Sequence, residues 1–292
     1  MKITDRIRSG EYVVTSEVGP AKGADESGIL QEAETLRKWV HAINVTDQQG
    51  AVMRLGSLAA SGMLKRQGLD PVFQLACRDR NRIALQSELL SASALGVDNV
   101  LCLTGDHVSL GDHPQAKPVF DLDSVSLLYA GSELKKGRDL AGNTLETAPD
   151  FDLGCVASPA AEPLRPQLYK LEKKVDAGAQ FVQTQAVYDP RTFEDFMKRV
   201  EHLKVPVILG MVLLKSGRMA RFMNKHVSGI RVPEPLVEEL DRAEDKRAAG
   251  VEIAARIIRE MGDMCQGVHL MPLDRVGAVP RILETAGGVE AV

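Results

Sequence analysis

The chain has 292 residues, enough to bury a large core in one big domain or two small ones, and its 44% apolar and 26% charged residues are ordinary for a soluble globular protein. The formal net charge of −4 gives no general reason to expect nucleic acid or an anionic membrane as a partner. No apolar stretch approaches the roughly 18 residues of a membrane span, and the N-terminal sequence lacks the apolar core of a secretory signal.

Strand-like and helix-like segments alternate along the chain. Apolar runs predict strands at residues 12–18, 42–46, 71–77, 99–106, 151–158, 179–185, 205–212 and 267–273. Apolar residues three and four apart predict helices at 26–40, 56–67, 81–96, 124–137, 162–177, 190–201, 216–225 and about 274–286, with extra helices at 234–262.

This alternation, without a linker rich in Pro, Gly or Ser, predicts an α/β fold. We expect a single (β/α)8 TIM barrel over residues 1–292, with extra helices before strand eight. An open doubly wound sheet is the alternative, but the turn after the first strand, VGPAKGAD, lacks the GxGxxG typical of that fold.

The four cysteines lie far apart and form no CxxC motif. Cys77, Cys102, Cys155 and Cys265 are spread over the chain, and three of them sit in apolar strand-like runs. We therefore expect buried, reduced thiols in a cytoplasmic protein, and neither metal ligands nor disulfides.

Polar residues stand where the predicted strands end, and barrel enzymes place their chemistry there. Glu17 ends the first strand and Asp106 the fourth, so two carboxylates are expected at the same mouth. Amides, hydroxyls and a histidine accompany them: Asn44, Thr46, Gln74, Ser158, Gln183, Gln185 and His269. Either acid alone would be as well explained as a helix cap or a lysine partner, but the two together favour a functional site.

The segments TSEVGPAKG, NVTD, CLTGD, LLYA and KKVDAGAQFVQTQAVYD closely resemble the methylenetetrahydrofolate reductase family, which consists of flavin-dependent (β/α)8 barrels of one-carbon metabolism. The resemblance runs in order from about residue 12 to about residue 273. Its most specific part is Lys173–Asp189.

The resemblance implies a role for each matched residue. Glu17 would be the general acid and hold the pterin ring, Asp106 would lie beside the flavin and the folate, and Gln185 would bind the substrate. The cofactor-binding positions would be Thr46, Gln74, Gly105, Asp106, Tyr129, Ala130, Ser158, Lys173 and Lys174.

The helix at 162–177 allows two interpretations of its lysines. Its apolar residues form one buried stripe: Leu164, Leu168, Leu171 and Val175. Lys170, Lys173 and Lys174 lie off that stripe, so periodicity alone makes them solubilising residues. The resemblance implies instead that Lys174, with Lys173, holds the phosphate or adenylate part of the flavin.

Two departures from the family pattern bear on the cofactor. Gln74 stands where many relatives have a histidine, and GCVASPAAEP lacks the Tyr and His that FAD-binding members place after strand five. FAD is favoured by the family, and these departures leave FMN open. The short chain looks most like reductase subunits of acetogens, several of which work with a zinc-containing partner and iron–sulfur carriers.

The implied reaction is the flavin-dependent reduction of 5,10-methylenetetrahydrofolate to 5-methyltetrahydrofolate. Electrons would come from NAD(P)H or a partner subunit, and the chain could form a homo-oligomer. The alternatives are a flavin-independent folate-binding barrel that transfers a methyl group, and a subunit of an electron-transfer complex.

Overall fold

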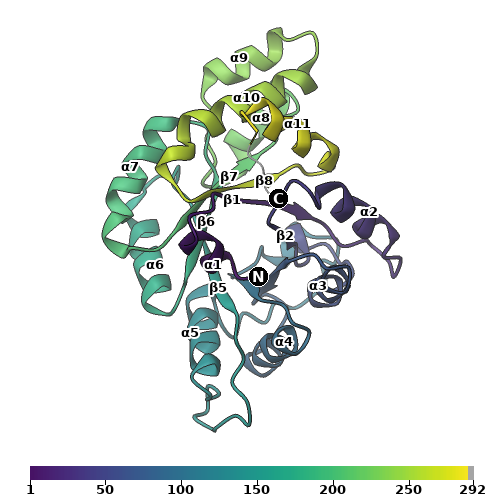
Figure 1. The fold of residues 1–292 in the computed structure, drawn as a ribbon, viewed down its shortest axis with the longest axis vertical. Coiled ribbons are helices and arrows are strands. Elements are labelled where there is room, and N and C mark those ends of the chain that lie inside the picture. Colours follow the sequence, from purple (N-terminus) through teal and green to yellow (C-terminus); the bar gives the residue numbers. More distant parts are fainter. Residues whose placement is uncertain (289–292) are drawn as a thin grey trace.

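The alternating segments form a closed barrel in the computed structural model, which describes residues 1–288 (Figure 1). Its parallel strands pair in sequence order, and the last strand pairs with the first. The strands are β1 Val13–Val18, β2 Ala42–Val45, β3 Pro71–Ala76, β4 Asn99–Leu103, β5 Asp152–Ala157, β6 Phe181–Ala186, β7 Val207–Val212 and β8 Gly267–Met271. The predicted (β/α)8 fold is confirmed; residues 289–292 of the expected domain lie outside the described residues.

Helices connect the strands around the outside of the barrel. They are α2 Ser27–Leu36, α3 Ser57–Arg66, α4 Arg82–Ala94, α5 Ser124–Lys135, α6 Arg165–Asp176, α7 Pro190–Val200, α8 Gly217–His226, α9 Glu234–Arg242, α10 Lys246–Met261 and α11 Val279–Thr285. The extra helices predicted before strand eight are α9 and α10, which lie with α8 at one edge of the molecule (Figure 1).

A short helix that the sequence did not predict, α1 (Ile3–Arg8), closes the N-terminal end of the barrel. The backbone N–H of Ile3 donates to Asn99 Oδ1 at 2.8 Å, and that of Thr4 donates to Asp152 Oδ2 at 2.8 Å. Both acceptors belong to the first residues of strands, so α1 lies across the strand ends near the centre of Figure 1. The side chain of Ile3 is fully buried in the barrel interior.

Strand alternation separates the barrel interior into an apolar lower half and a polar upper half. The lower layer is a cluster formed by Ile3, Val13, Ala42, Val72, Leu101, Phe181 and Ile208. Gly154 makes room for this layer, because a Cβ there would lie 2.2 Å from the ring of Phe181. Residues two positions further along the strands again point inward, and several of these are polar.

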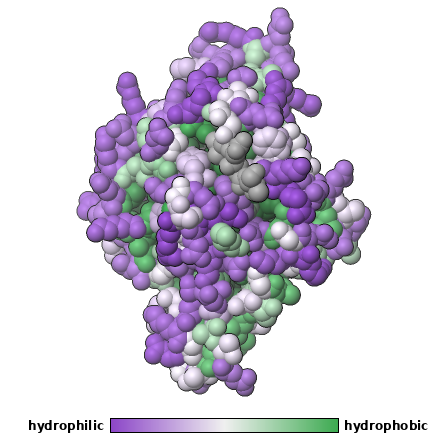
Figure 2. Space-filling model, viewed as in Figure 1, coloured by the Kyte–Doolittle hydropathy of each residue, from purple (hydrophilic) through white to green (hydrophobic). Residues whose placement is uncertain are grey.

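All four cysteines are buried and unpaired, as expected. Burial raises the pKa of Cys77 to about 12 and that of Cys155 to about 11. Over residues 1–288, no helix combines the length and apolar character needed to cross a bilayer. The face that carries α1 is mostly hydrophilic, with hydrophobic residues in separate groups (Figure 2).

Candidate active site

Several predicted site residues share the inner face of the barrel at its C-terminal end. Glu17 lies on β1, only 8% exposed, and pairs in register with Asn44 of β2. Thr46 continues the β2 ladder, since its N–H donates to the Val18 carbonyl at 3.2 Å. Gln74 lies on β3, two residues past the inward-facing Val72. Gln185 lies on β6, where the pairing with β7 shifts register between Gln183 and Ala186. Strand alternation therefore gathers Glu17, Thr46 and Gln74 at one mouth, and Gln185 stands at the same end of β6.

Below Glu17 lies a histidine that the sequence marked only as a polar residue in strand eight. The Nε2 atom of His269 is 3.9 Å from Glu17 Oε2, and its Nδ1 atom is 2.9 Å from Thr15 Oγ1. His269 is 4% exposed. The pairing of Thr15 with His269 in the β1–β8 register explains why these two side chains meet.

Gly105 and Asp106 follow β4 and form part of the rim. Gly105 has φ +90°, and a Cβ there would lie 3.1 Å from the Cβ of Ala76. A glycine is required at such a turn because it combines a left-handed backbone with a close neighbour. The turn directs Asp106 to an exposed position, where its carboxylate accepts from the N–H of Gly50 at 3.1 Å.

Two rim residues that the sequence analysis missed lie next to Asp106. Arg78 is 2% exposed, and its guanidinium donates to the carbonyls of Asp106 and Gln48, each at 3.3 Å. Phe120 stacks on His107 with ring centroids 6.3 Å apart, and its φ of +41° is unusual for an aromatic residue. The sequence signal for Phe120 was an aromatic residue in a long loop that follows the predicted site strand.

Lys174 is not on the solvated side of its helix, which corrects the interpretation from periodicity. It is 8% exposed, and its Nζ atom donates to the carbonyl of Val156 on β5 at 2.5 Å. Burial lowers the pKa of Lys174. Lys173, by contrast, is exposed and lies 4.6 Å above the ring of Tyr169. Only one of the two matched lysines is thus directed toward the barrel.

Tyr129 and Ala130 lie on α5, away from the mouth residues described above. Tyr129 is 51% exposed on the outer face of the helix, and Ala130 is fully buried in the core. Neither side chain is placed with Glu17 or Asp106.

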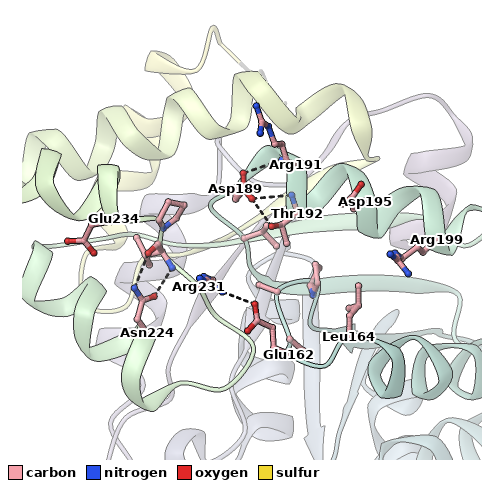
Figure 3. Close-up of a pocket in the computed structure, with 16 residues that line it drawn as sticks. Glu162, Leu164, Asp189, Arg191, Thr192, Asp195, Arg199, Asn224, Arg231 and Glu234 are labelled. Atoms are coloured by element: carbon pink, nitrogen blue, oxygen red, sulfur yellow. Dashed lines mark hydrogen bonds and ion pairs between the residues drawn. The ribbon is translucent and has the colours of Figure 1, made fainter.

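A cavity of about 800 Å³ begins at Pro159, the residue after Ser158 (Figure 3). A Cβ at Gly229 would lie 3.0 Å from that of Ser158, so the α8–α9 connection touches this serine. In the lining of the cavity, an ion pair of 2.7 Å joins Arg231 to Glu162. Its remaining lining includes Val187, two residues beyond Gln185.

Comparison with known proteins assigns this barrel to a family. The family model described as methylenetetrahydrofolate reductase matches residues 2–287, which is nearly the whole chain. The chain belongs to the methylenetetrahydrofolate reductase family. The matched residues include α1 and the strands that carry Glu17, Gln74, Gln185 and His269. The residues of the mouth therefore lie within the part of the chain that matches the family model.

Curated relatives of this methylenetetrahydrofolate reductase family member differ in length. A probable methylenetetrahydrofolate reductase (NADPH) of Caenorhabditis elegans is 26% identical over 243 residues, covering 79% of this chain and 34% of that protein. The 5,10-methylenetetrahydrofolate reductase of Salmonella typhimurium is 25% identical over 237 residues, covering 77% and 73%. The chain matches between 34% and 38% of the first eukaryotic relatives, so it corresponds to one part of them.

A solved structure supports the fold of the family member. An uncharacterized protein from Clostridium thermocellum, described as binding two copies of 5-methyl-5,6,7,8-tetrahydrofolic acid, superposes with a TM-score of 0.67. It covers 99% of both chains at 15% identity. At this identity the likeness establishes the architecture alone.

Proposed function

We propose that this chain reduces 5,10-methylenetetrahydrofolate to 5-methyltetrahydrofolate with a bound flavin. The observation that carries the proposal is the placement of Glu17, a nearly buried carboxyl group, inside the mouth of a barrel from this family. The folate ligand described for the Clostridium thermocellum structure and the names of the curated relatives support the same substrate class.

The residues around the mouth fit a flavin. The hydroxyl of Thr46 is buried and has no hydrogen-bond partner among the described residues, so it is free to bind a polar atom of a ligand. Lys174 is buried, and its ammonium group could form a charge-assisted hydrogen bond with a phosphate group. Thr46, Gln74 and Gly105 would hold the ring system, and Lys174 would hold the phosphate of FAD or FMN.

When bound, a flavin supplies the hydride that reduces the substrate. The protein must open the five-membered ring of the substrate first, and ring opening needs a proton on the leaving nitrogen. Glu17 would give that proton as general acid. Opening leaves a cationic iminium on the substrate, and Asp106 would stabilise it electrostatically. Gln185 would hold the pterin by hydrogen bonds.

We further propose that the electron donor is NAD(P)H or a partner subunit, and that the protein works in the cytoplasm. Buried, unpaired thiols are consistent with a reducing compartment. Extraction of the cofactor followed by chromatography would distinguish FAD from FMN. A protein purified without the visible absorbance of an oxidised flavin would favour the alternative of methyl transfer.

The test of the proposed function is Glu17→Gln. Only ring opening needs the proton, so we expect the variant to lose about 10²–10⁴-fold in folate reduction while its flavin is still reduced by its own donor. Stopped-flow measurement separates the two half-reactions. An equal fall in both would show that Glu17 serves the fold and would overturn its assignment as the acid.

A further inference from the structure

Beneath Glu17, the barrel interior contains a connected set of polar side chains. Asn44 Nδ2 donates to Gln183 Oε1 at 2.8 Å, and Gln183 Nε2 donates to Asn44 Oδ1 at 3.2 Å and to Thr15 Oγ1 at 3.3 Å. Thr15 Oγ1 in turn lies 2.9 Å from His269 Nδ1. These side chains come from β1, β2, β6 and β8, and none is more than 4% exposed. Bulk water therefore does not compete for their hydrogen bonds.

The orientation of the Gln183 amide bears on which ring nitrogen of His269 carries the proton. A threonine hydroxyl has one proton to donate. The hydroxyl of Thr15 accepts from Gln183, and among the described residues the acceptor within reach of its proton is His269 Nδ1. Because Nδ1 accepts, the proton of the neutral ring is on Nε2.

In this tautomer, the nitrogen that carries the proton is the one that faces Glu17. The distance from Nε2 to Glu17 Oε2 is 3.9 Å, longer than a direct hydrogen bond. Contacts of this kind are often long in ligand-free sites and shorten when the substrate binds. Over residues 1–288, Glu17 is the carboxylate within ion-pair distance of His269. A donor on Oε2 from below leaves Oε1 free to face the mouth.

We propose that His269 is a positioning residue for Glu17. Thr15, Gln183 and Asn44 hold its ring as the Nε2–H tautomer, and this N–H orients Glu17 so that Oε1 presents the acidic proton to the substrate. The inference rests on the proposed function, because it takes Glu17 to be the acid. His269 gives up no proton in this role.

The tautomer is tested without any activity measurement. Protein labelled with 15N-histidine contains six histidines, and the signals of His269 are those that disappear in His269→Gln. We expect the two-bond 1H–15N spectrum to show the proton on Nε2, and Thr15→Val to abolish this fixed state. A proton on Nδ1 in the wild-type protein would overturn the proposal, whatever the protein catalyses.

The positioning role is tested by two substitutions that each keep one nitrogen. The amide nitrogen of His269→Gln lies near the position of Nε2, and that of His269→Asn lies near the position of Nδ1. We expect His269→Asn to lower kcat for folate reduction by about 10²-fold with little change in KM, since a small misplacement of the acid has effects of that size. His269→Gln should retain roughly tenfold more activity than His269→Asn.

His41→Gln is the matched control, because His41 is also buried but precedes β2 at the opposite end of the barrel. We expect it to leave folate reduction unchanged. Equal losses in both His269 variants, accompanied by lower melting temperatures, would overturn the positioning role. A flavin-loaded wild type that reduces no folate but keeps the Nε2–H tautomer would overturn the proposed function and leave the tautomer established.

Discussion

The ammonium group of Lys174 is buried with only a neutral partner, the carbonyl oxygen of Val156. Burial lowers its pKa, and the nearby Cys155 opposes this effect. No carboxylate among residues 1–288 lies within ion-pair distance of it. A buried cation without an anionic partner destabilises the folded state. A ligand phosphate would supply the missing anionic partner. In the flavin-free protein that partner is absent, so Lys174 lowers the stability of the folded state.

Replacing Lys174 with methionine is therefore expected to have opposite effects on stability and on binding. Lys174→Met should raise the free energy of unfolding of the flavin-free protein by about 1 kcal/mol and weaken flavin retention. The folded pKa of Lys174 lies below its ordinary 10.5, so the unfolded chain binds more protons between the two values. The advantage of the variant should consequently shrink as the pH rises toward 10.5.

Thermal melts over this pH range and flavin titrations check the prediction for Lys174. Lys173→Met is the control, because Lys173 is exposed, and its effect on stability should stay within about 0.5 kcal/mol. A Lys174→Met variant that is less stable than the wild type at neutral pH would mean that the bond to Val156 outweighs the cost of burial.

The charge of Asp106 can be separated from its hydrogen bond. Asp106→Asn keeps a side-chain oxygen that accepts from the N–H of Gly50, so the loop and the melting temperature should change little. The loss of charge should slow folate reduction by about tenfold or more. It should also make the bound flavin easier to reduce, because a nearby negative charge opposes formation of the anionic reduced state. Redox titration beside a thermal melt tests this; lower stability with an unshifted potential would assign Asp106 to the fold.

At the scale of elements, one arginine joins the loops that follow β2, β3 and β4. Arg78 belongs to the β3–α4 loop, and it reaches the backbone of Gln48 in one neighbouring loop and of Asp106 in the other. In the sequence it stands in the segment CRDRN, which has the composition of an exposed turn. Its burial depends on two loops that are distant in sequence, so no local pattern could have predicted it.

Helix α1 should contribute to stability and not to the mouth. Ile3→Ala removes a fully buried side chain from the lower layer, so we expect a loss of about 2–5 kcal/mol in chemical denaturation. The flavin dissociation constant should not change, because α1 lies at the opposite end of the barrel. Ile83→Ala is the control, since Ile83 is 74% exposed on α4 and should cost less than about 0.5 kcal/mol. Equal stability of the two variants would show that α1 does not hold the barrel closed.

The strands could be predicted because each is a short apolar run bounded by polar residues, and their observed bounds differ from the predicted ones mainly at the ends. Helix α1 was missed because ITDRIR is too short for a periodic pattern, and its burial depends on strand ends far away in the sequence. Periodicity alone puts Lys174 on the wrong face for a related reason: of the apolar stripe on α6 only Leu171 is buried, and Lys174 is buried against the barrel as well.

The direction of a side chain could be predicted where strand alternation alone fixes it, as for Glu17 and Gln74. The direction of a side chain could not be predicted where a hydrogen-bond partner from another element fixes it. The tautomer proposed for His269 depends on Thr15 and on Gln183, which comes from a distant strand of the barrel. In the sequence, Thr15 is only a polar residue within an apolar strand. The exposure of Tyr129 and the burial of Ala130 depend in the same way on what packs against each face of their helix.

At the scale of the whole molecule, the cysteines report on the cooperativity of the barrel. Cys102 and Cys155 lie on β4 and β5, Cys77 directly follows β3, and Cys265 precedes β8. Burial raises the pKa of all four thiols, so little thiolate is present at neutral pH. Three of the cysteines are fully buried and Cys265 is 7% exposed. Reaction with a thiol reagent therefore requires the strands to open.

If the barrel unfolds as one cooperative unit, all four thiols should react together, at the rate at which the protein unfolds. A large excess of an aromatic disulfide reagent at neutral pH, followed by mass spectrometry at intervals, should show molecules with no label or four labels and few between. Cys265 provides the sharpest comparison, because it adjoins the β8–β1 seam that closes the barrel, and its Sγ contacts the Gly267 carbonyl at 3.2 Å. Labelling of Cys265 alone, ahead of the other three, would show that this seam opens locally while the rest of the barrel stays folded.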